Sequence, residues 1–259
     1  MQGSRNEAAA LNALGLMYKD QARYDEARAL YGRALSLLES EAEPDQDDIA
    51  TIYHNLGGIE HARGDHAAGE PFARRGLAIR LSLPGADPHA VAADQVALAA
   101  ILDGLRQYAE SERLYLAALE VFEREADTRE IAVTLNDLGA QYAERGRLEQ
   151  ATDLLERAAA LKKQALGPRH PDTAVTLNNL ALAWRRREAF DRAAALYLEA
   201  TGIFEESLGV DHPKTGTCRA NAARCAAAST STRPTPASPV SAPRTARSAA
   251  PSGRTPRTS

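Results

Sequence analysis

Apolar and small residues recur along most of the chain with the spacing of one helix face. Leu177, Leu180, Ala181 and Trp184 fall at i, i+3, i+4 and i+7, which is the pattern of an amphipathic helix. A short polar break follows, and then a second apolar stretch. We predict a pair of helices there, over residues 173–186 and 190–207.

This helix pair is repeated five times. Each unit has a small anchor residue preceded by leucine, and the anchors are 42, 42, 40 and 42 residues apart. Small residues return 12 and 19 positions after each anchor, where they would let two antiparallel helices approach closely. Such a period indicates a stacked-repeat architecture. The anchors are Gly15, Gly57, Ala99, Gly139 and Ala181, and the later small residues are Ala27, Gly69, Ser111, Ala151, Ala193, Ala34, Gly76, Ala118, Ala158 and Ala200.

The connectors between units have the residues of helix ends. Gly167 suits a helix C-terminus, and Pro171 suits the first position of the next helix, where no amide hydrogen is needed. Residues 208–215 repeat this arrangement. We therefore interpret His170 and His212, which precede the two prolines, as parts of helix caps rather than metal ligands or catalytic groups.

The run 177–181 with Trp184, Phe190 and Ala193, together with the connector 166–173, resembles a tetratricopeptide repeat. It is most similar to the 42-residue type of kinesin light chains and many bacterial signalling proteins. The resemblance implies an all-α, right-handed superhelical solenoid of antiparallel helix pairs over residues 5–226, with five repeats and a partial sixth. It also implies a non-catalytic scaffold that binds a protein or an extended peptide, or a detached sensor arm of a larger signalling ATPase or protease system.

The resemblance places the first helix of each pair on a concave groove. The face not used for packing then holds the positions three before, one after, and four or five after each anchor. Asparagines on this face could bond a peptide backbone, or instead bond the neighbouring repeat. An arginine pair at one end would favour acidic peptides, and the middle unit, with Val96, Ala100 and Gly104, would form an apolar pocket. The candidate peptide-binding residues are Asn12, Lys19, His54, Asn136, Asn178, Arg185 and Arg186.

Nothing in the sequence indicates catalysis, a cofactor or a metal. His54 and His61 are seven residues apart, whereas zinc-binding histidine pairs on a helix are four apart. Nucleophile-elbow, phosphate-loop and dinucleotide-binding motifs are absent. Cys218 and Cys225, two helical turns apart, are too distant for a disulfide.

Charge divides the chain unevenly. The first 211 residues hold 23 basic and 35 acidic residues, and the remainder holds eight basic residues and no acidic one. The acidic first 211 residues are a poor ligand for nucleic acid and suit partners of positive charge.

No apolar run is long enough to span a membrane, and the first residues lack the pattern of a secretory signal. We therefore expect a cytoplasmic protein.

Residues 227–259 are almost wholly Ser, Thr, Pro, Ala and Arg, which predicts a disordered basic tail. Two interpretations of the tail stay open. The tail could contact nucleic acid, a membrane or an acidic partner, or the reading frame could have been lost within the sixth repeat.

In the second unit, Pro71 is expected to kink or break the second helix. We therefore expect the N-terminal half of the solenoid to unfold first.

Overall fold

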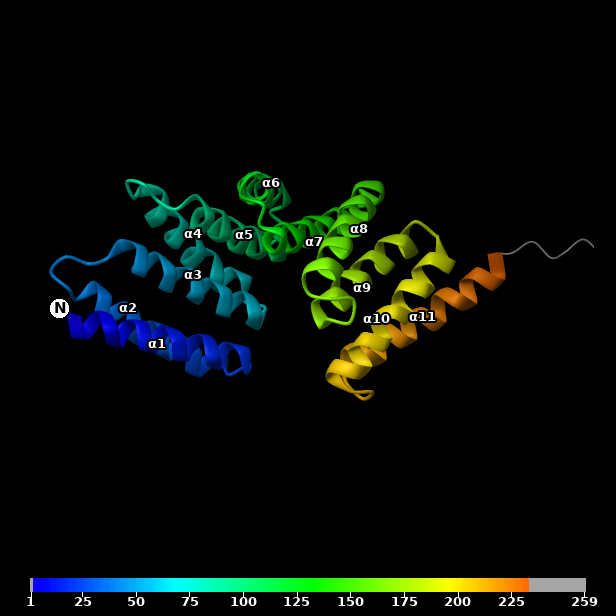
Figure 1. Ribbon diagram of the computed structural model, residues 1–259, viewed down its shortest axis with the longest axis horizontal. Helices are drawn as coiled ribbons and strands as arrows, with labels where there is room; N and C mark the ends of the chain where they lie inside the picture. The colour runs from blue at the N-terminus through cyan, green and yellow to red at the C-terminus, as the bar shows by residue number, and fades with distance from the viewer. Residues whose placement is uncertain (1, 233–259) are drawn as a thin grey trace, which may run out of the picture.

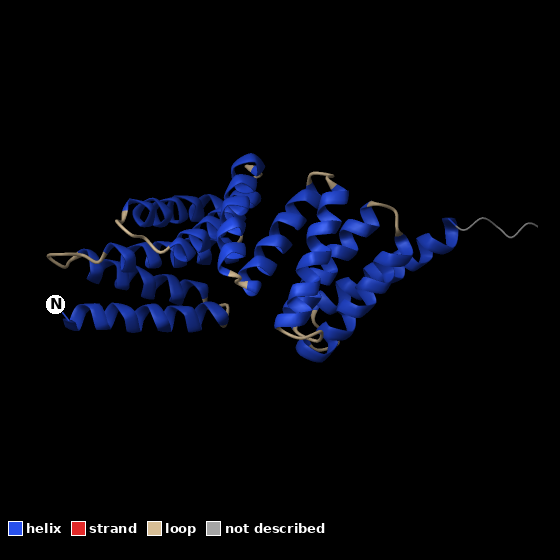
Figure 2. Ribbon diagram, turned by 45° about the horizontal axis from the view of Figure 1, so that its top comes forward, coloured by secondary structure: helices blue, strands red, loops and turns tan. Residues whose placement is uncertain are grey.

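The computed structural model describes residues 2–232, which form eleven helices (Figure 1). Within this range there is no strand, and short loops join the helices (Figure 2). The helices are α1 (Gln2–Asp20), α2 (Tyr24–Glu39), α3 (Gln46–Arg63), α4 (His66–Ser82), α5 (Pro88–Gly104), α6 (Tyr108–Glu125), α7 (Thr128–Glu144), α8 (Leu148–Ala165), α9 (Pro171–Arg186), α10 (Phe190–Leu208) and α11 (Pro213–Thr232).

The helices pack as five consecutive pairs followed by α11. In each pair the first helix contacts the second. The first helices of the first four repeats also contact the first helix of the next repeat, as α3 does with α5 and α7 with α9, and α11 packs on α10. In Figure 1, α1 and α11 lie at opposite ends of an elongated stack, and α6 is seen end-on while α1 lies across the view. The helix axes therefore rotate along the stack, which confirms the predicted all-α solenoid.

The small residues lie where the two helices of a pair meet. A Cβ added to Gly15 would lie 2.4 Å from Cε1 of Tyr31, and one added to Gly139 would lie 2.7 Å from Cγ of Leu155. All fifteen predicted small positions are buried. In both cases the large side chain comes from the second helix, sixteen residues after the anchor. In the second repeat this position is Ala73, and a Cβ added to Gly57 would lie 3.2 Å from the backbone nitrogen of Ala73, so there the two helices themselves approach closely.

The breaks within the repeats also lie where the polar segments predict them. Each break contains one residue in the left-handed region, seven positions after the anchor. Glycine holds this position in two repeats, as Gly64 (φ 79°) and Gly146 (φ 77°), while Ala22, Arg106 and Glu188 adopt φ of about 60° in the others. A side chain costs roughly 1–2 kcal/mol in this conformation, so three of the five turns carry local strain.

The connectors confirm the capping interpretation. Nδ1 of His170 accepts a hydrogen bond from the amide of Asp172 at 3.1 Å, and Nδ1 of His212 accepts one from the amide of Lys214 at 3.2 Å. Both histidines thus satisfy amides at the start of a helix that begins with proline. Gly167, at the end of the preceding helix, has a φ of 96°.

Two expectations about helix lengths differ from the structure. Helix α4 continues from His66 to Ser82 through Pro71, so the expected break is absent. Pro71 is exposed and comes early in the helix, where the loss of one backbone hydrogen bond leaves a long helical remainder intact. Helix α11 extends to Thr232, beyond the expected boundary at residue 226. Residues 233–259, and with them most of the predicted tail, lie outside the described residues.

Cys218 and Cys225 are both free and buried in α11. They pack in one apolar cluster with Tyr197 and Phe204 of α10, as small core residues would. The partial sixth repeat therefore covers the apolar face of the fifth.

Candidate functional site

A cleft of about 290 Å³ opens between the first helices of the second, third and fourth repeats. The lining residues come mainly from α5 and α7, with one each from α3, α4 and α6. Most of the lining positions belong to the face that the repeat pattern predicts for the groove. The lining residues are His61, His66, Ala100, Asp103, Gly104, Tyr115, Asp137, Ala140, Gln141 and Glu144.

A hydrogen-bonded triangle forms one side of the cleft. Oδ1 of Asp103 accepts hydrogen bonds from Oγ of Ser111 at 2.5 Å and from Nε2 of Gln141 at 2.6 Å. Nε2 of Gln141 also donates to Oγ of Ser111 at 2.9 Å. Burial raises the pKa of Asp103, and these two donors partly offset the shift.

The same triangle fixes the orientation of the Gln141 amide. Turning the amide over would place its oxygen against the Asp103 carboxylate, so the nitrogen must face that side. The oxygen, Oε1, then has no hydrogen-bond partner among residues 2–232, although Gln141 is only 2% exposed. A buried acceptor without a partner is costly, and this one belongs to a residue that lines the cleft.

Asp137 is the second carboxylate of the cleft. Its Oδ1 accepts a hydrogen bond from Nδ2 of Asn136 at 2.9 Å. Burial raises the pKa of Asp137 to about 6, despite that hydrogen bond and the charge of Lys162. The carboxylate is therefore held in a setting that disfavours its negative charge.

The cleft carboxylates differ from the other acidic groups inside the solenoid in having no basic partner. Within residues 2–232, Asp103, Asp137 and Glu144 form no ion pair with Lys, Arg or His. Elsewhere, Glu60 pairs with Arg28, Asp94 with Arg80, and Glu112 with Arg145 and Arg147. Glu144 accepts only the hydroxyl of Tyr108, at 3.2 Å.

Two histidines lie on the side of the cleft nearest the second repeat. The ring centroids of His61 and His66 are 5.1 Å apart. Burial lowers the pKa of His61, and nearby His66 and Lys19 lower it further. The His66 ring covers Gly104, where an added Cβ would lie 2.1 Å from Cδ2, and Nδ1 of His66 is buried without a partner among the described residues.

The apolar pocket expected in the middle repeat is therefore wrong. Ala100, Gly104 and Ala140 do leave space, but carboxylates and amides surround that space. Asp103 and Glu144 could be placed on the groove from their positions in the repeat. Asp137 and Gln141 were missed because they lie on the flank of α7, where the helix period alone does not show which neighbours they meet.

The predicted asparagines mainly bond between neighbouring repeats. Oδ1 of Asn12 accepts a hydrogen bond from Asn55 at 2.7 Å, and Oδ1 of Asn136 accepts one from Asn179 at 3.2 Å. Both bonds join the position three before one anchor to the position two before the next. Asn136 is 7% exposed, so most of its surface is already covered.

The same register explains why Asp137 lacks a partner across the repeat. Asp137 lies two before its anchor, as Asn55 and Asn179 do before theirs, but the facing position in the preceding repeat is Val96. A valine side chain offers no hydrogen bond. The hydrogen bond between asparagines of neighbouring repeats is therefore missing at the cleft, and Asp137 instead accepts a hydrogen bond from Asn136 of its own helix.

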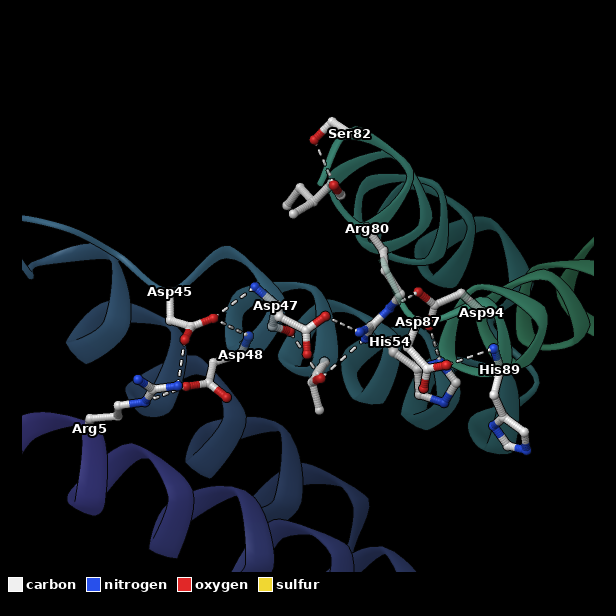
Figure 3. Close-up of polar contacts among 12 residues, drawn as sticks. Arg5, Asp45, Asp47, Asp48, His54, Arg80, Ser82, Asp87, His89 and Asp94 are labelled. Atoms are coloured by element: carbon white, nitrogen blue, oxygen red, sulfur yellow. Dashed lines mark hydrogen bonds and ion pairs between the residues drawn. The ribbon is translucent and has the colours of Figure 1, made fainter. Parts of the chain in front are cut away.

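His54 belongs to a polar network that ties three helices together (Figure 3). Its Nδ1 lies 2.8 Å from Oδ1 of Asp94 in α5, and Oδ2 of Asp94 lies 2.7 Å from Nε of Arg80 in α4. Arg80 also donates to Asp47 and, at 3.2 Å, to Thr51 of α3. Arg80 and Asp94 are almost fully buried, so the network joins the second and third repeats.

The remaining predicted residues differ in the contacts that their side chains make within the protein. Arg186 donates to the carbonyl of Ala143 near the end of α7. Oδ1 of Asn178 lies 3.6 Å from Sγ of Cys218. Lys19 and Arg185 are half-buried, and a Cβ added to Gly58 would lie 3.2 Å from Nζ of Lys19. The structure therefore does not gather the seven residues into one site.

The family model of the tetratricopeptide repeat matches this chain in four overlapping windows, over residues 6–82, 48–124, 91–164 and 130–206. The chain belongs to the tetratricopeptide repeat family. Its repeats are of the kinesin-light-chain type, in agreement with the 42-residue period.

Two curated relatives come from Arabidopsis thaliana. Protein KINESIN LIGHT CHAIN-RELATED 2 is 23% identical over 217 residues, covering 66% of this chain and 33% of the relative. Protein KINESIN LIGHT CHAIN-RELATED 1 is 25% identical over 170 residues, covering 64% of this chain and 28% of the relative. The tetratricopeptide repeat chain thus spans about a third of the length of these relatives.

Solved structures share the right-handed solenoid. BtubC (BKLC) from P. vanneervenii superimposes with a TM-score of 0.58 at 24% identity, covering 90% of this chain and 84% of that one. The apo quorum sensor NprR from B. thuringiensis gives 0.63 at 17% identity, with 82% and 56% covered. A Rap protein complexed with Competence and Sporulation Factor gives 0.60 at 16% identity, with 85% and 66% covered.

The hydropathy of the helices and the arrangement of possible metal ligands bear on the kind of site. Between residues 2 and 232, every helix is too short or too polar to span a bilayer. In the same range, no three or more His, Cys, Asp or Glu side chains are arranged to hold a metal ion. The groups of the cleft are hydrogen-bond acceptors and negative charges, which suit the binding of N–H donors.

Proposed function

We propose that this tetratricopeptide repeat protein is a non-catalytic scaffold that binds an extended peptide, or a segment of a protein, along the first helices of its repeats. The observation that carries the proposal is the cleft, because it is built from equivalent positions of three consecutive repeats. A segment that follows the stack would meet these positions one after another. A flat or filled face would offer no such track.

Among the seven predicted contact residues, four donate no side-chain hydrogen bond within residues 2–232. These four, which all lie on the predicted face, are Asn12, Lys19, Asn178 and Arg185. We propose them as the peptide contacts that flank the cleft. His54, Asn136 and Arg186 would contribute only through the donors left over from their bonds to other residues of the solenoid.

A sensor arm is a more specific form of the same proposal. Its support is the similarity in fold to a quorum sensor and to a Rap protein in complex with Competence and Sporulation Factor. The preference for acidic peptides at Arg185 and the cytoplasmic location both stay predictions. Nucleic-acid binding through the basic residues after Asp211 is the alternative from another class, since that segment has eight positive charges and no negative one.

A matched pair of variants tests the groove. Peptides are selected from a displayed random library on the full chain, and their dissociation constants are measured on Ala140→Tyr and Ala160→Tyr. Ala140 lines the cleft, whereas Ala160 is an exposed residue of α8. We expect a loss of about tenfold or more in affinity for the first variant only, since overfilling a binding site costs about as much as overfilling a core.

The opposite result rejects the proposal. If Ala140→Tyr binds the selected peptides as tightly as Ala160→Tyr does, the cleft is not the binding track. If no peptide is selected, while a DNA duplex binds in a salt-sensitive way that requires residues 227–259, the nucleic-acid alternative replaces it.

A further inference from the structure

We infer that the cleft between α5 and α7 is a pocket for one basic side chain, arginine above all, of the bound peptide. The groups that would receive it are the carboxylates of Asp137 and Glu144 and the amide oxygen of Gln141. The inference rests on the proposed function, because it names the chemistry of the peptide that the groove takes.

The first support is the match between acceptors and donors. Asp137, Glu144 and Oε1 of Gln141 offer acceptors, and Oε1 has no partner within residues 2–232. A guanidinium group presents five N–H donors in a planar fork and no acceptor. It could therefore satisfy a carboxylate and the buried amide oxygen at once, whereas a neutral side chain would leave the charge unmatched.

The second support is the absence of a cation where the solenoid otherwise supplies one. Glu60, Asp94 and Glu112 each have an arginine within 4.0 Å, but none of the cleft carboxylates does among the described residues. Lys162 acts on Asp137 only from beyond ion-pair distance. An unpaired carboxylate in a partly buried site favours an incoming positive charge.

The opposing charges near the cleft are few. Burial, with smaller contributions from His66 and Lys19, lowers the pKa of His61, which disfavours a positive charge on this ring. Lys19 lies near Gly58 and acts on His61, at the side of the cleft formed by the second repeat, and Lys19 does not line the cleft. The body of the protein is acidic as a whole, which would also speed the approach of a basic peptide.

The third support is the shape of the cleft. Ala100, Gly104 and Ala140 line it with small side chains, along which the aliphatic part of an arginine could lie while its head reaches the carboxylates. The volume of about 290 Å³ is close to the lower limit of small-ligand pockets, about 300 Å³. It is sized for one side chain rather than for a folded element.

The test compares selections on the wild-type protein and on the double variant Asp137→Asn/Glu144→Gln. A displayed random dodecapeptide library is the probe. The control is Asp153→Asn/Glu156→Gln, which makes the same charge change at two exposed positions of α8. Thermal unfolding of all three proteins shows that the variants are folded.

We expect one position of the wild-type peptides to be rich in arginine or lysine, and this preference to persist on the control and vanish on the cleft variant. Replacing that arginine by citrulline, its neutral isostere, should weaken binding to wild type about tenfold or more, in line with charge-assisted hydrogen bonds. On the cleft variant the two peptides should bind within about twofold.

Three results overturn the inference and separate it from the proposed function. Selected peptides that still lose affinity on Ala140→Tyr but show no basic position refute the pocket and leave the groove intact. Failure to select any peptide refutes both. Free arginine amide that binds as tightly as the selected peptide refutes a peptide as the occupant.

Discussion

The replacement Asp137→Asn should make the protein more stable while it weakens peptide binding. Burial raises the pKa of Asp137 from 3.8 to about 6 in the folded state. The folded protein therefore holds this proton more strongly than the unfolded chain. Wild-type stability from this group is greatest below pH 4 and is lost as the pH rises through about 6, because the folded state must then carry a disfavoured charge.

The pKa difference sets the size of the effect. A shift of about two units at 1.36 kcal/mol per unit corresponds to at most ~3 kcal/mol at pH 7.5. Asparagine removes the charge and keeps the oxygen that accepts the hydrogen bond from Asn136. The titration also depends on Asp103, Glu130 and Lys162, which face Asp137. Because the Asp137 carboxylate in turn favours the charge of buried Lys162, its removal takes back part of the gain, and the increase in stability is smaller than the single-group limit.

Urea unfolding at several pH values between 4 and 8 measures this difference. The variant should be more stable by about 1–3 kcal/mol at pH 7.5, and the gap should narrow as the pH falls toward 4. Asp153→Asn, at an exposed site, should change stability by no more than ~0.5 kcal/mol. A cleft variant that is less stable than wild type at pH 7.5 would mean that Asp137 is a structural group, and the reasoning would fail.

Three further outcomes are expected. Ala151→Leu, at a fully buried helix contact, should lower stability by about 1–3 kcal/mol in urea unfolding, and an unchanged midpoint would contradict the small-residue packing. Residues 66–82 should exchange amide hydrogens faster than residues 148–166, because Pro71 and two glycines weaken α4; slower exchange would refute this. Asn178→Ala should weaken peptide binding about threefold to tenfold and leave the melting temperature unchanged. Asn136→Ala should chiefly lower the melting temperature, because it loses two hydrogen bonds between side chains.

The repeat pattern predicted the architecture because small residues mark where the two helices of a pair lie close together. Gly15 and Gly139 are small for one physical reason, which is that a Tyr31 or Leu155 side chain lies directly against the helix. A small residue is needed at the equivalent position of each unit, where a side chain or the backbone of the second helix lies close, and this repetition is visible in one sequence. The same holds for Pro171 and the histidine before it, whose caps follow from local geometry.

The chemistry of the cleft could not be predicted in the same way. The state of Asp137 depends on Val96, which lies in the preceding repeat and interrupts a contact that Asn12 and Asn136 make elsewhere. The helix period places residues on a face but does not show which long side chains meet across repeats. For the same reason His54 was predicted as a peptide contact, although Arg80 and Asp94 engage it in a buried network.

The continuity of α4 shows a different limit of sequence reasoning. A proline in a helix removes one hydrogen bond and crowds one carbonyl, which is a local penalty. The packing of the whole repeat outweighs it, since Ala73 and Leu77, which follow Pro71 in the helix, remain in the core. Local propensity therefore shows where a helix carries a penalty, but does not show that the helix ends there.

Site-specific photo-crosslinking tests the central claim, that the first helices form the peptide-binding track, most directly. Benzoylphenylalanine is placed at residue 185 on α9, a proposed peptide contact that flanks the cleft, or at residue 160 on α8, and each protein is irradiated with a labelled peptide selected on the wild type. Crosslinking from residue 185 and not from residue 160, suppressed by unlabelled peptide, is the predicted result. Crosslinking from residue 160 alone would contradict the account.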